Sequence, residues 1–274
     1  MILKKLEKIV EENKILYKGY ILNLLKSYLQ LLILDFIYNS KYSFLIFQGG
    51  SCLRVCFDLP RLSEDLDFDY EKDFDFKKFA DDIANYIKKD QNFPQLEMKV
   101  SLESVYLKFP VLKSLALAGP SESDKLYIKI DTALIKKCPF KTELQSIFKQ
   151  EFSFLIKRYD LPDLMAGKVE AVLERAWFKG KKNEITIKGR DYFDLYWYMQ
   201  KKITPNYDCI FCQGKKLQPQ KIWQKIIQRV NKIKSKDLEY DLINLVQDQV
   251  FVRNFCKNYK TLFNEAIKQY LTTK

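Results

Sequence analysis

Apolar and polar residues recur with helical spacing through the first forty positions of the chain. One or two helices are expected over residues 3–39. The apolar stretch 20–38 is interrupted by Lys26, Gln30 and Asp35, which together leave an apolar stripe. The stretch is therefore too polar for a convincing membrane span, and the pattern predicts a helix of the protein core.

The next part of the chain has the hydrophobic periodicity of β-strands. Residues 43–47 form a short apolar run, and apolar and polar residues alternate over 61–70, 96–109 and 125–131, with a further apolar run at 111–118. A helix is expected near 76–89, capped by Asp73 or Asp75. Helices followed by several strands predict an α+β sheet domain.

The remainder of the chain reads as helical. A helix is predicted over residues 160–175, where a proline and acidic residues occupy the first turn, and two or three more are expected near 217–234, 237–248 and 259–272. We therefore expect a sheet domain over residues 1–160 and a helical C-terminal domain over residues 161–274.

Charge is distributed unevenly between these two parts. The chain of 274 residues has a formal net charge of +12. Residues 1–160 carry 25 Lys+Arg against 23 Asp+Glu, whereas residues 161–274 carry 22 against 12, an excess of +2 and +10 respectively. This division suits an enzyme that acts on nucleic acid. The alternative is a basic surface that reflects only a lysine-rich proteome.

The absence of histidine limits the chemistry that the chain can perform. It excludes Ser-His-Asp and Cys-His catalysis and all histidine metal sites. Six cysteines occur, and only Cys209 and Cys212 have a spacing typical of metal ligands, with no second pair to complete a zinc site. We expect reduced structural thiols in a cytoplasmic protein, and no signal peptide is evident at the start of the chain.

The stretch 43–70 carries the most informative chemistry. Gly49 and Gly50 separate an apolar strand-like run from a helix-like segment that begins at Ser51. Such a turn lets the backbone approach a polyphosphate, and the helix amides and the Ser51 hydroxyl can contact it. Further along, Asp65 and Asp67 are two residues apart on a predicted strand, so both can reach the same divalent ions. The alternative is an acidic edge strand with solvated charges.

The same stretch resembles the first motif of the AbiEii/AbiGii toxin family, which belongs to the polymerase-beta-like nucleotidyltransferase superfamily. The matching residues are Gly49-Gly50-Ser51-x-Leu53-Arg54 and the run from Leu59 to Phe68. The resemblance implies that two magnesium ions bind Asp65 and Asp67. It also implies an NTP site formed by Gly49, Gly50, Ser51, Arg54 and Lys168.

Three further motifs of this family have counterparts along the chain. Lys129-Ile130-Asp131 resembles the second motif, which implies Asp131 as a third metal ligand, although a solvated aspartate before a turn is equally compatible with the spacing. Ala166, Lys168, Ala171 and Arg175 match the third motif, in which the lysine would neutralise charge on the leaving pyrophosphate. Residues 190–195 resemble the fourth, where Asp191 is assigned to the active centre and Asp194 to holding Arg190 or the fold.

The resemblance implies transfer of a nucleoside monophosphate from an NTP to a hydroxyl. Relatives are toxins of toxin–antitoxin or abortive-infection systems, so a cognate antitoxin encoded nearby is expected. Some extend the acceptor end of transfer RNA, which makes RNA the favoured acceptor. A basic connector mixed with aromatic residues could contact RNA or be a solvated loop, and it contains Lys179, Lys181, Lys182 and Lys188. A protein or small-molecule acceptor and a non-catalytic RNA-binding role are the alternatives.

Overall fold

A computed structural model describes residues 2–72, 74–135, 138–175 and 187–272 of the chain. The chain divides into two compact units. Unit 1 comprises Met1–Lys136 and Thr142–Arg158, and unit 2 comprises Lys137–Lys141 and Tyr159–Lys274. The first contains a sheet with helices and the second is mainly helical, so the predicted α+β class is confirmed.

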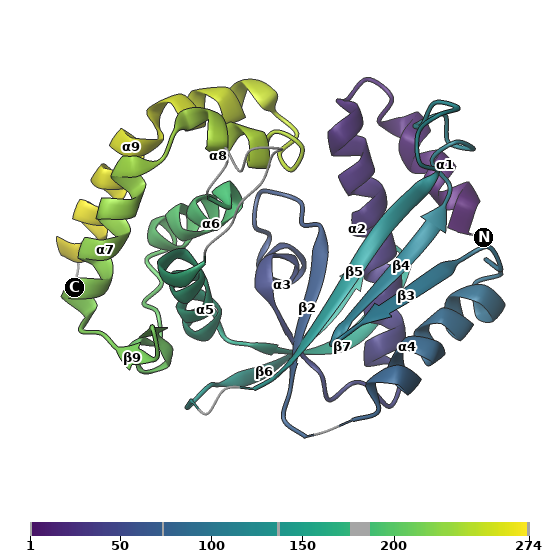
Figure 1. Ribbon diagram of the computed structural model, residues 1–274, viewed down its shortest axis with the longest axis horizontal. Helices are drawn as coiled ribbons and strands as arrows, with labels where there is room; N and C mark the ends of the chain where they lie inside the picture. Colours follow the sequence, from purple (N-terminus) through teal and green to yellow (C-terminus); the bar gives the residue numbers. More distant parts are fainter. Residues whose placement is uncertain (1, 73, 136–137, 176–186, 273–274) are drawn as a thin grey trace. The chain divides into compact units, whose positions relative to one another are not determined.

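Unit 1 is built on a seven-stranded mixed sheet with the strand order β3-β4-β5-β2-β1-β7-β6 (Figure 1). The central strand β2 pairs antiparallel with β1 and parallel with β5, and β1 pairs parallel with β7. The strands are β1 (Ile46–Gln48), β2 (Asp65–Tyr70), β3 (Glu97–Ser101), β4 (Ser104–Pro110), β5 (Lys125–Leu134), β6 (Thr142–Lys149) and β7 (Phe152–Tyr159).

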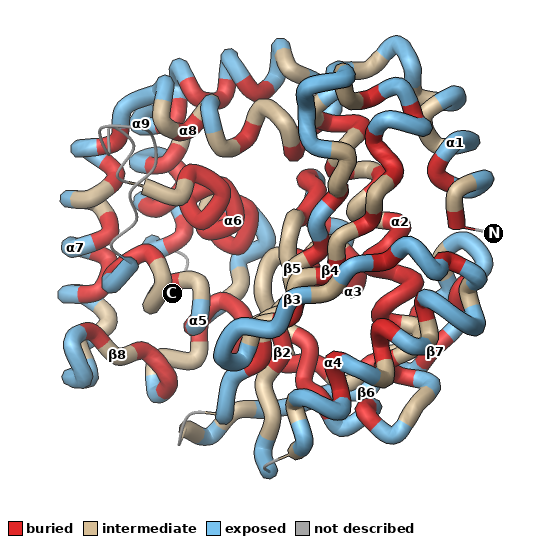
Figure 2. The backbone as a smooth tube through the Cα atoms, turned by 45° about the vertical axis from the view of Figure 1, so that its right-hand side comes forward, coloured by how far each residue is buried: buried red, intermediate tan, exposed pale blue. Residues whose placement is uncertain are grey.

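The helices of unit 1 are α1 (Ile2–Glu12), α2 (Lys18–Tyr38), α3 (Gly49–Phe57) and α4 (Phe76–Asn85), which continues into a π-helical turn η1 (Tyr86–Asp90). By length and apolar composition alone α2 could cross a membrane, but it is largely buried inside the protein (Figure 2). Tyr38 stacks on Phe154 of β7 with ring centroids 6.0 Å apart. As predicted, α2 is a core helix.

Local signals in the sequence account for several element boundaries. Asp75 caps α4, because its carboxylate accepts a hydrogen bond of 2.8 Å from the backbone N–H of Lys78. The strand predicted over 96–109 is two strands, since the chain turns at Leu102 with a positive φ of 51°. The apolar run 111–118 forms turns instead of regular structure, and β6 and β7 were not predicted.

Unit 2 consists of α5 (Leu161–Glu174), α6 (Gly189–Gln200), a 3₁₀ turn η2 (Tyr207–Cys209), the short strands β8 (Phe211–Cys212) and β9 (Lys215–Lys216), α7 (Pro219–Lys232), α8 (Ser235–Leu242) and α9 (Gln249–Thr272). Asp160 caps α5 by accepting a 2.9 Å hydrogen bond from the backbone N–H of Asp163. Trp223, Tyr198 and Tyr259 are among its largest fully buried side chains. The predicted helical C-terminal part is confirmed.

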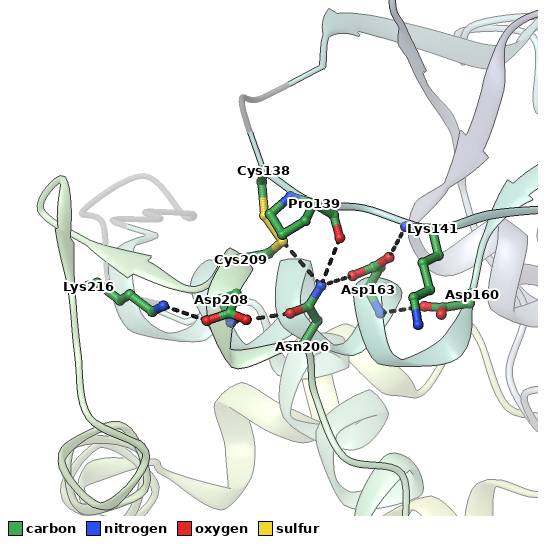
Figure 3. Close-up of a disulfide and its surroundings, with 9 residues drawn as sticks. All are labelled: Cys138, Pro139, Lys141, Asp160, Asp163, Asn206, Asp208, Cys209 and Lys216. Atoms are coloured by element: carbon green, nitrogen blue, oxygen red, sulfur yellow. Dashed lines mark hydrogen bonds and ion pairs between the residues drawn. A yellow bond between two sulfur atoms is a disulfide. The ribbon is translucent and has the colours of Figure 1, made fainter.

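A disulfide between Cys138 and Cys209 joins two segments of unit 2 that are 71 residues apart in sequence (Figure 3). Beside it, the Asn206 amide donates to the carbonyl of Pro139 at 3.3 Å and to Asp163 at 2.6 Å. The expectation that the cysteines are reduced is therefore wrong for this pair. The other four are free and buried, namely Cys52, Cys56, Cys212 and Cys256.

Candidate active site

Three aspartates of unit 1 lie on one face of the sheet. In β2, Leu66 and Phe68 are buried in the core and alternate with the partly exposed Asp65 and Asp67. The parallel register between β2 and β5 places Asp67 directly opposite Asp131. Because directly opposite residues point to the same face of a sheet, the third carboxylate joins the first two. This is the face on which the sequence placed a metal site.

Gly49 lets the Asp67 carboxylate approach the turn between β1 and α3. Its φ of +74° is a left-handed conformation that disfavours other residues. A Cβ atom at Gly49 would overlap the Asp67 carboxylate. The absence of a side chain at Gly49 therefore allows the close contact between the turn and Asp67, a predicted metal ligand.

Gly50 has a different neighbour. A Cβ atom at this position would lie 2.7 Å from a guanidinium nitrogen of Arg61 and 3.1 Å from the Ser63 hydroxyl. Arg61 is only 2% exposed and donates to the carbonyl of Leu62 at 2.8 Å. The absence of a side chain at Gly50 thus accommodates a buried arginine that lies against the turn.

Ser51 and Arg54, both predicted to bind NTP, contact the protein itself in this structure. The buried Ser51 hydroxyl donates to the backbone carbonyl of Asp65, which ties the start of α3 to the start of β2. Arg54 donates to the carbonyl of Leu59 at 3.1 Å. These contacts hold the two halves of the motif together, and contact of either residue with NTP stays a prediction.

Lys129 places a positive charge among the aspartates. Its ammonium lies 2.7 Å from an Asp131 carboxylate oxygen, and the other oxygen of Asp131 accepts a 2.5 Å hydrogen bond from Ser104. Burial disfavours the charged lysine, but the hydrogen bond and charge of Asp131, with a smaller contribution from Asp65, outweigh it and raise the pKa of Lys129. The carboxylate face thus already holds one cation.

The aspartates are aligned but not gathered around one point. Across residues 2–72, 74–135, 138–175 and 187–272, no three Cys, Asp or Glu side chains are close enough together to hold a metal ion. The donor chemistry still fits a hard divalent cation, which prefers carboxylate oxygens. Asp65, Asp67 and Asp131 are the residues that would bind it.

Unit 2 contains a second cluster of charges, formed by α5 and α6. The Lys168 ammonium lies 2.7 Å from Asp191 and 2.9 Å from Asp194. Arg175 forms an ion pair with the other oxygen of Asp191. Asp191 is 3% exposed and Asp194 is fully buried. Both aspartates therefore hold the predicted NTP-binding lysine, and the assignment of Asp191 to the active centre and of Asp194 to holding Arg190 or the fold stays a prediction.

Two pKa values in this cluster are lowered, for different reasons. Burial alone would raise the pKa of Asp191, but the charges of Lys168 and Arg175 lower it to about 2. Burial, together with the charges of Arg190, Arg175 and Lys168, lowers the pKa of Lys188 to about 8, although Asp191 opposes the shift. At Asp191 the neighbouring cations thus outweigh burial, whereas at Lys188 burial and the neighbouring cations outweigh Asp191.

Lys188, predicted to contact RNA, is the N-cap residue of α6 and is partly buried. This position places it with the charge cluster of unit 2, and its contact with RNA stays a prediction. Lys179, Lys181 and Lys182 lie outside the described residues.

Lys129 and Arg61 lie within motifs that were matched in the sequence, but neither was assigned to the site. Lys129 could have been found, because it is two residues from Asp131 on a predicted strand and must share its face. The position of Arg61 against Gly50 could not be predicted, because it depends on how the chain turns between α3 and β2. Arg175 was noted as a motif match, and the structure adds its ion pair with Asp191.

The glycine turn that leads into a helix and the aspartates aligned on two neighbouring strands lie within the part of the chain that matches a known family. Residues 36–247 match the family described as nucleotidyl transferase AbiEii toxin, type IV toxin–antitoxin system. The chain belongs to this family.

Two crystal structures from Helicobacter pylori are similar to the chain. The first, JHP933, is 14% identical, with 92% of this chain and 94% of that chain covered and a TM-score of 0.48. The second, a candidate nucleotidyltransferase, is 13% identical, with 89% and 95% covered and a TM-score of 0.46. Among curated proteins, no sequence matches.

Proposed function

We propose that this nucleotidyltransferase uses an NTP to add a nucleoside monophosphate to a hydroxyl of RNA, with transfer RNA as the first candidate acceptor. The observation that carries the proposal is the alignment of Asp67 with Asp131 beside Gly49. A phosphoryl transfer site needs charge stabilisation and positioning more than covalent chemistry, and aligned carboxylates beside a backbone turn supply both. The acceptor is inferred from the basic second half of the chain.

Magnesium is the metal that this donor set fits best, and two ions would bind Asp65, Asp67 and Asp131. Such ions would stabilise the attacking and leaving oxygens of an in-line displacement. The protein's own contribution is to hold Asp67 against the turn through Gly49 and Asp65 against α3 through Ser51. Lys129 offers a positive charge beside Asp131 that can contact an anionic substrate.

In unit 2, Lys168 is the residue proposed to contact the triphosphate. Asp191 and Asp194 both form ion pairs with its ammonium, which fixes the direction of the Lys168 side chain. A preorganised ammonium in a site with little water stabilises charge on the leaving pyrophosphate far better than a solvated lysine. Asp191 also forms an ion pair with Arg175, so the same carboxylate positions two cations.

The family is that of a type IV toxin–antitoxin system, so a cognate antitoxin is part of the proposal. A cytoplasmic location is part of it as well, since NTPs and RNA meet there.

The test is to incubate the purified chain with each of the four labelled NTPs, magnesium and total RNA. Parallel incubations contain total protein or small metabolites in place of RNA. We expect the label in RNA with one preferred NTP, and its loss when a chelator removes magnesium. Label in the protein or metabolite fraction would replace RNA as the acceptor. Absence of metal-dependent NTP binding in calorimetry would contradict an enzymatic role.

The contribution of the basic connector is tested separately. Replacing Lys179, Lys181 and Lys182 together by Ala should weaken RNA binding and flatten its salt dependence, because each lost phosphate contact removes released counterions. Turnover at saturating RNA should persist. An unchanged salt slope would show that these lysines do not contact RNA.

A further inference from the structure

The strand β6 lies at one end of the sheet of unit 1, with β7 as its neighbour among the described strands (Figure 1). One face of β6 is occupied, because Ile147 is buried and the Gln145 amide donates to the carbonyl of Cys56 at 3.2 Å. The opposite face is open. It carries Leu144, which is 66% exposed, and Phe148, which is 77% exposed.

The other end of the sheet is different. Edge strands can pair with another chain, and proteins usually prevent this with short strands and charged side chains. β3 has five residues, and its charged residues Glu97 and Lys99 stand between apolar ones. β6 has eight residues, and its only charged residues, Glu143 and Lys149, flank the uncharged segment Leu144–Phe148. This edge therefore lacks the protection that β3 has.

The sequence of β6 is complementary to itself when it is read antiparallel. With a twofold axis at Ser146, Leu144 of one strand stands opposite Phe148 of the other on the open face. The same register places Glu143 opposite Lys149, although each already has a partner within its own copy: Glu143 lies 2.9 Å from Arg158, and Lys149 lies 3.2 Å from Asp58. In a register shifted by two residues, Leu144 would no longer stand opposite Phe148, nor Glu143 opposite Lys149. A one-residue shift would place open-face residues opposite residues of the occupied face.

We propose that β6 pairs antiparallel with β6 of a second copy of this chain, with the twofold axis at Ser146. The apolar pair of Leu144 and Phe148 would supply the attraction. The match of Glu143 with Lys149 would add little affinity, because both charges are already paired within each copy and solvated charges attract weakly. An interface of one strand per copy is small, so we expect a reversible, concentration-dependent dimer.

Sedimentation velocity of the full chain over a wide range of concentration tests the association. We expect a monomer–dimer equilibrium, and Ser146→Lys should raise the dimer dissociation constant at least tenfold, because it places two like charges opposite each other. The matched control is Ser153→Lys on the neighbouring strand β7, also at an exposed serine, which should leave the equilibrium unchanged. A chain that stays monomeric at every concentration would overturn the proposal.

The register has its own test. Paired residues of antiparallel strands lie close enough for a disulfide, so Ser146→Cys should form a covalent dimer on mild oxidation, whereas Ser153→Cys should not. Leu144→Ala should weaken the dimer, because it removes the apolar partner of Phe148. If Phe148→Ala reduces RNA binding and leaves the association state unchanged, the open face is an RNA platform and the dimer proposal is wrong.

Discussion

Asp67 of β2 stands directly opposite Asp131 of β5, although the two residues are 64 positions apart in the sequence. The parallel register between these strands places their carboxylates on one face of the sheet. Gly49 adds the turn to the same face, because its missing side chain leaves room for the Asp67 carboxylate. The most sensitive positions of the site should therefore be those that support this alignment.

Asp67→Asn should reduce nucleotide transfer by about 10²-fold or more and leave the protein folded. A bound divalent ion stabilises the transition state by several kcal/mol, and each 1.4 kcal/mol is a tenfold change in rate. Asp81→Asn is the matched control and should leave the rate unchanged, since Asp81 is an exposed aspartate of the helix α4. Initial rates with saturating magnesium and NTP measure the effect. Near-normal rates in Asp67→Asn would refute the metal assignment.

Gly49→Ala should lower both activity and stability. The new Cβ would displace the Asp67 carboxylate, and a left-handed backbone costs about 1–2 kcal/mol for a residue with a side chain. Gly167→Ala is the control, because this glycine lies inside α5, where an added Cβ would meet no atom within 4 Å. That substitution should stabilise the chain by about 0.5–1 kcal/mol. Denaturant unfolding and transfer rates of both variants test the contrast.

Local sequence patterns were sufficient to predict most of the elements. The alternation of Leu66 and Phe68 with Asp65 and Asp67 predicted β2 and its two faces, because one face is buried and the other is not. The helix start at Asp160 followed from its cap and its acidic first turn. β6 was not predicted. It is an edge strand in which the apolar residues Leu144 and Phe148 are exposed, so apolar positions do not mark a buried face.

Features that depend on contacts between distant segments could not be predicted from the sequence. Asp131 could be named from its motif, but its position opposite Asp67 follows from strand order, which periodicity does not contain. The pairing of Cys138 with Cys209 also depends on the tertiary fold, because spacing directed attention to Cys212. The contact that Asp191 and Asp194 share with Lys168 was not predicted for the same reason, since it depends on how α5 and α6 lie against each other.

Lys168→Met should reduce turnover by about 10²-fold, the scale for removing a preorganised charge partner. It should also destabilise unit 2 by about 3 kcal/mol, because the buried Asp194 loses its ammonium partner. Asp194→Asn in the same chain should recover part of the lost stability without restoring turnover. Unfolding curves and transfer rates of the single and double variants separate the two effects. Full recovery of turnover would show that Lys168 has only a structural role.

Reduction of the disulfide between Cys138 and Cys209 should destabilise unit 2. A crosslink across 71 residues of sequence restricts the unfolded chain by about 4 kcal/mol in the chain-entropy view. Guanidinium unfolding of the unaltered chain with and without reductant measures the difference, and Cys138→Ser should match the reduced chain. Cys212→Ser is the control, since Cys212 is buried but free. Identical unfolding midpoints in the presence and absence of reductant would contradict the prediction.

Lys188→Met should stabilise the free protein at pH 7. The Lys188 ammonium is partly buried beside Arg190, Arg175 and Lys168, and its pKa is lowered to about 8, below the ordinary value near 10.4. Between these two values the unfolded chain binds more protons than the folded one. The penalty of the charged lysine, about 3 kcal/mol, is therefore present at neutral pH and relieved as the pH rises through this range.

Denaturant unfolding of the unaltered chain and the Lys188→Met variant from pH 7 to 10 measures this difference directly. We expect the variant to be more stable at pH 7, with an advantage that shrinks as the pH rises, because other titrating groups are common to both proteins. Lys201→Met is the control, since Lys201 is exposed at the end of the same helix. An advantage of Lys188→Met that does not change with pH would show that the lysine destabilises through packing and not through its charge.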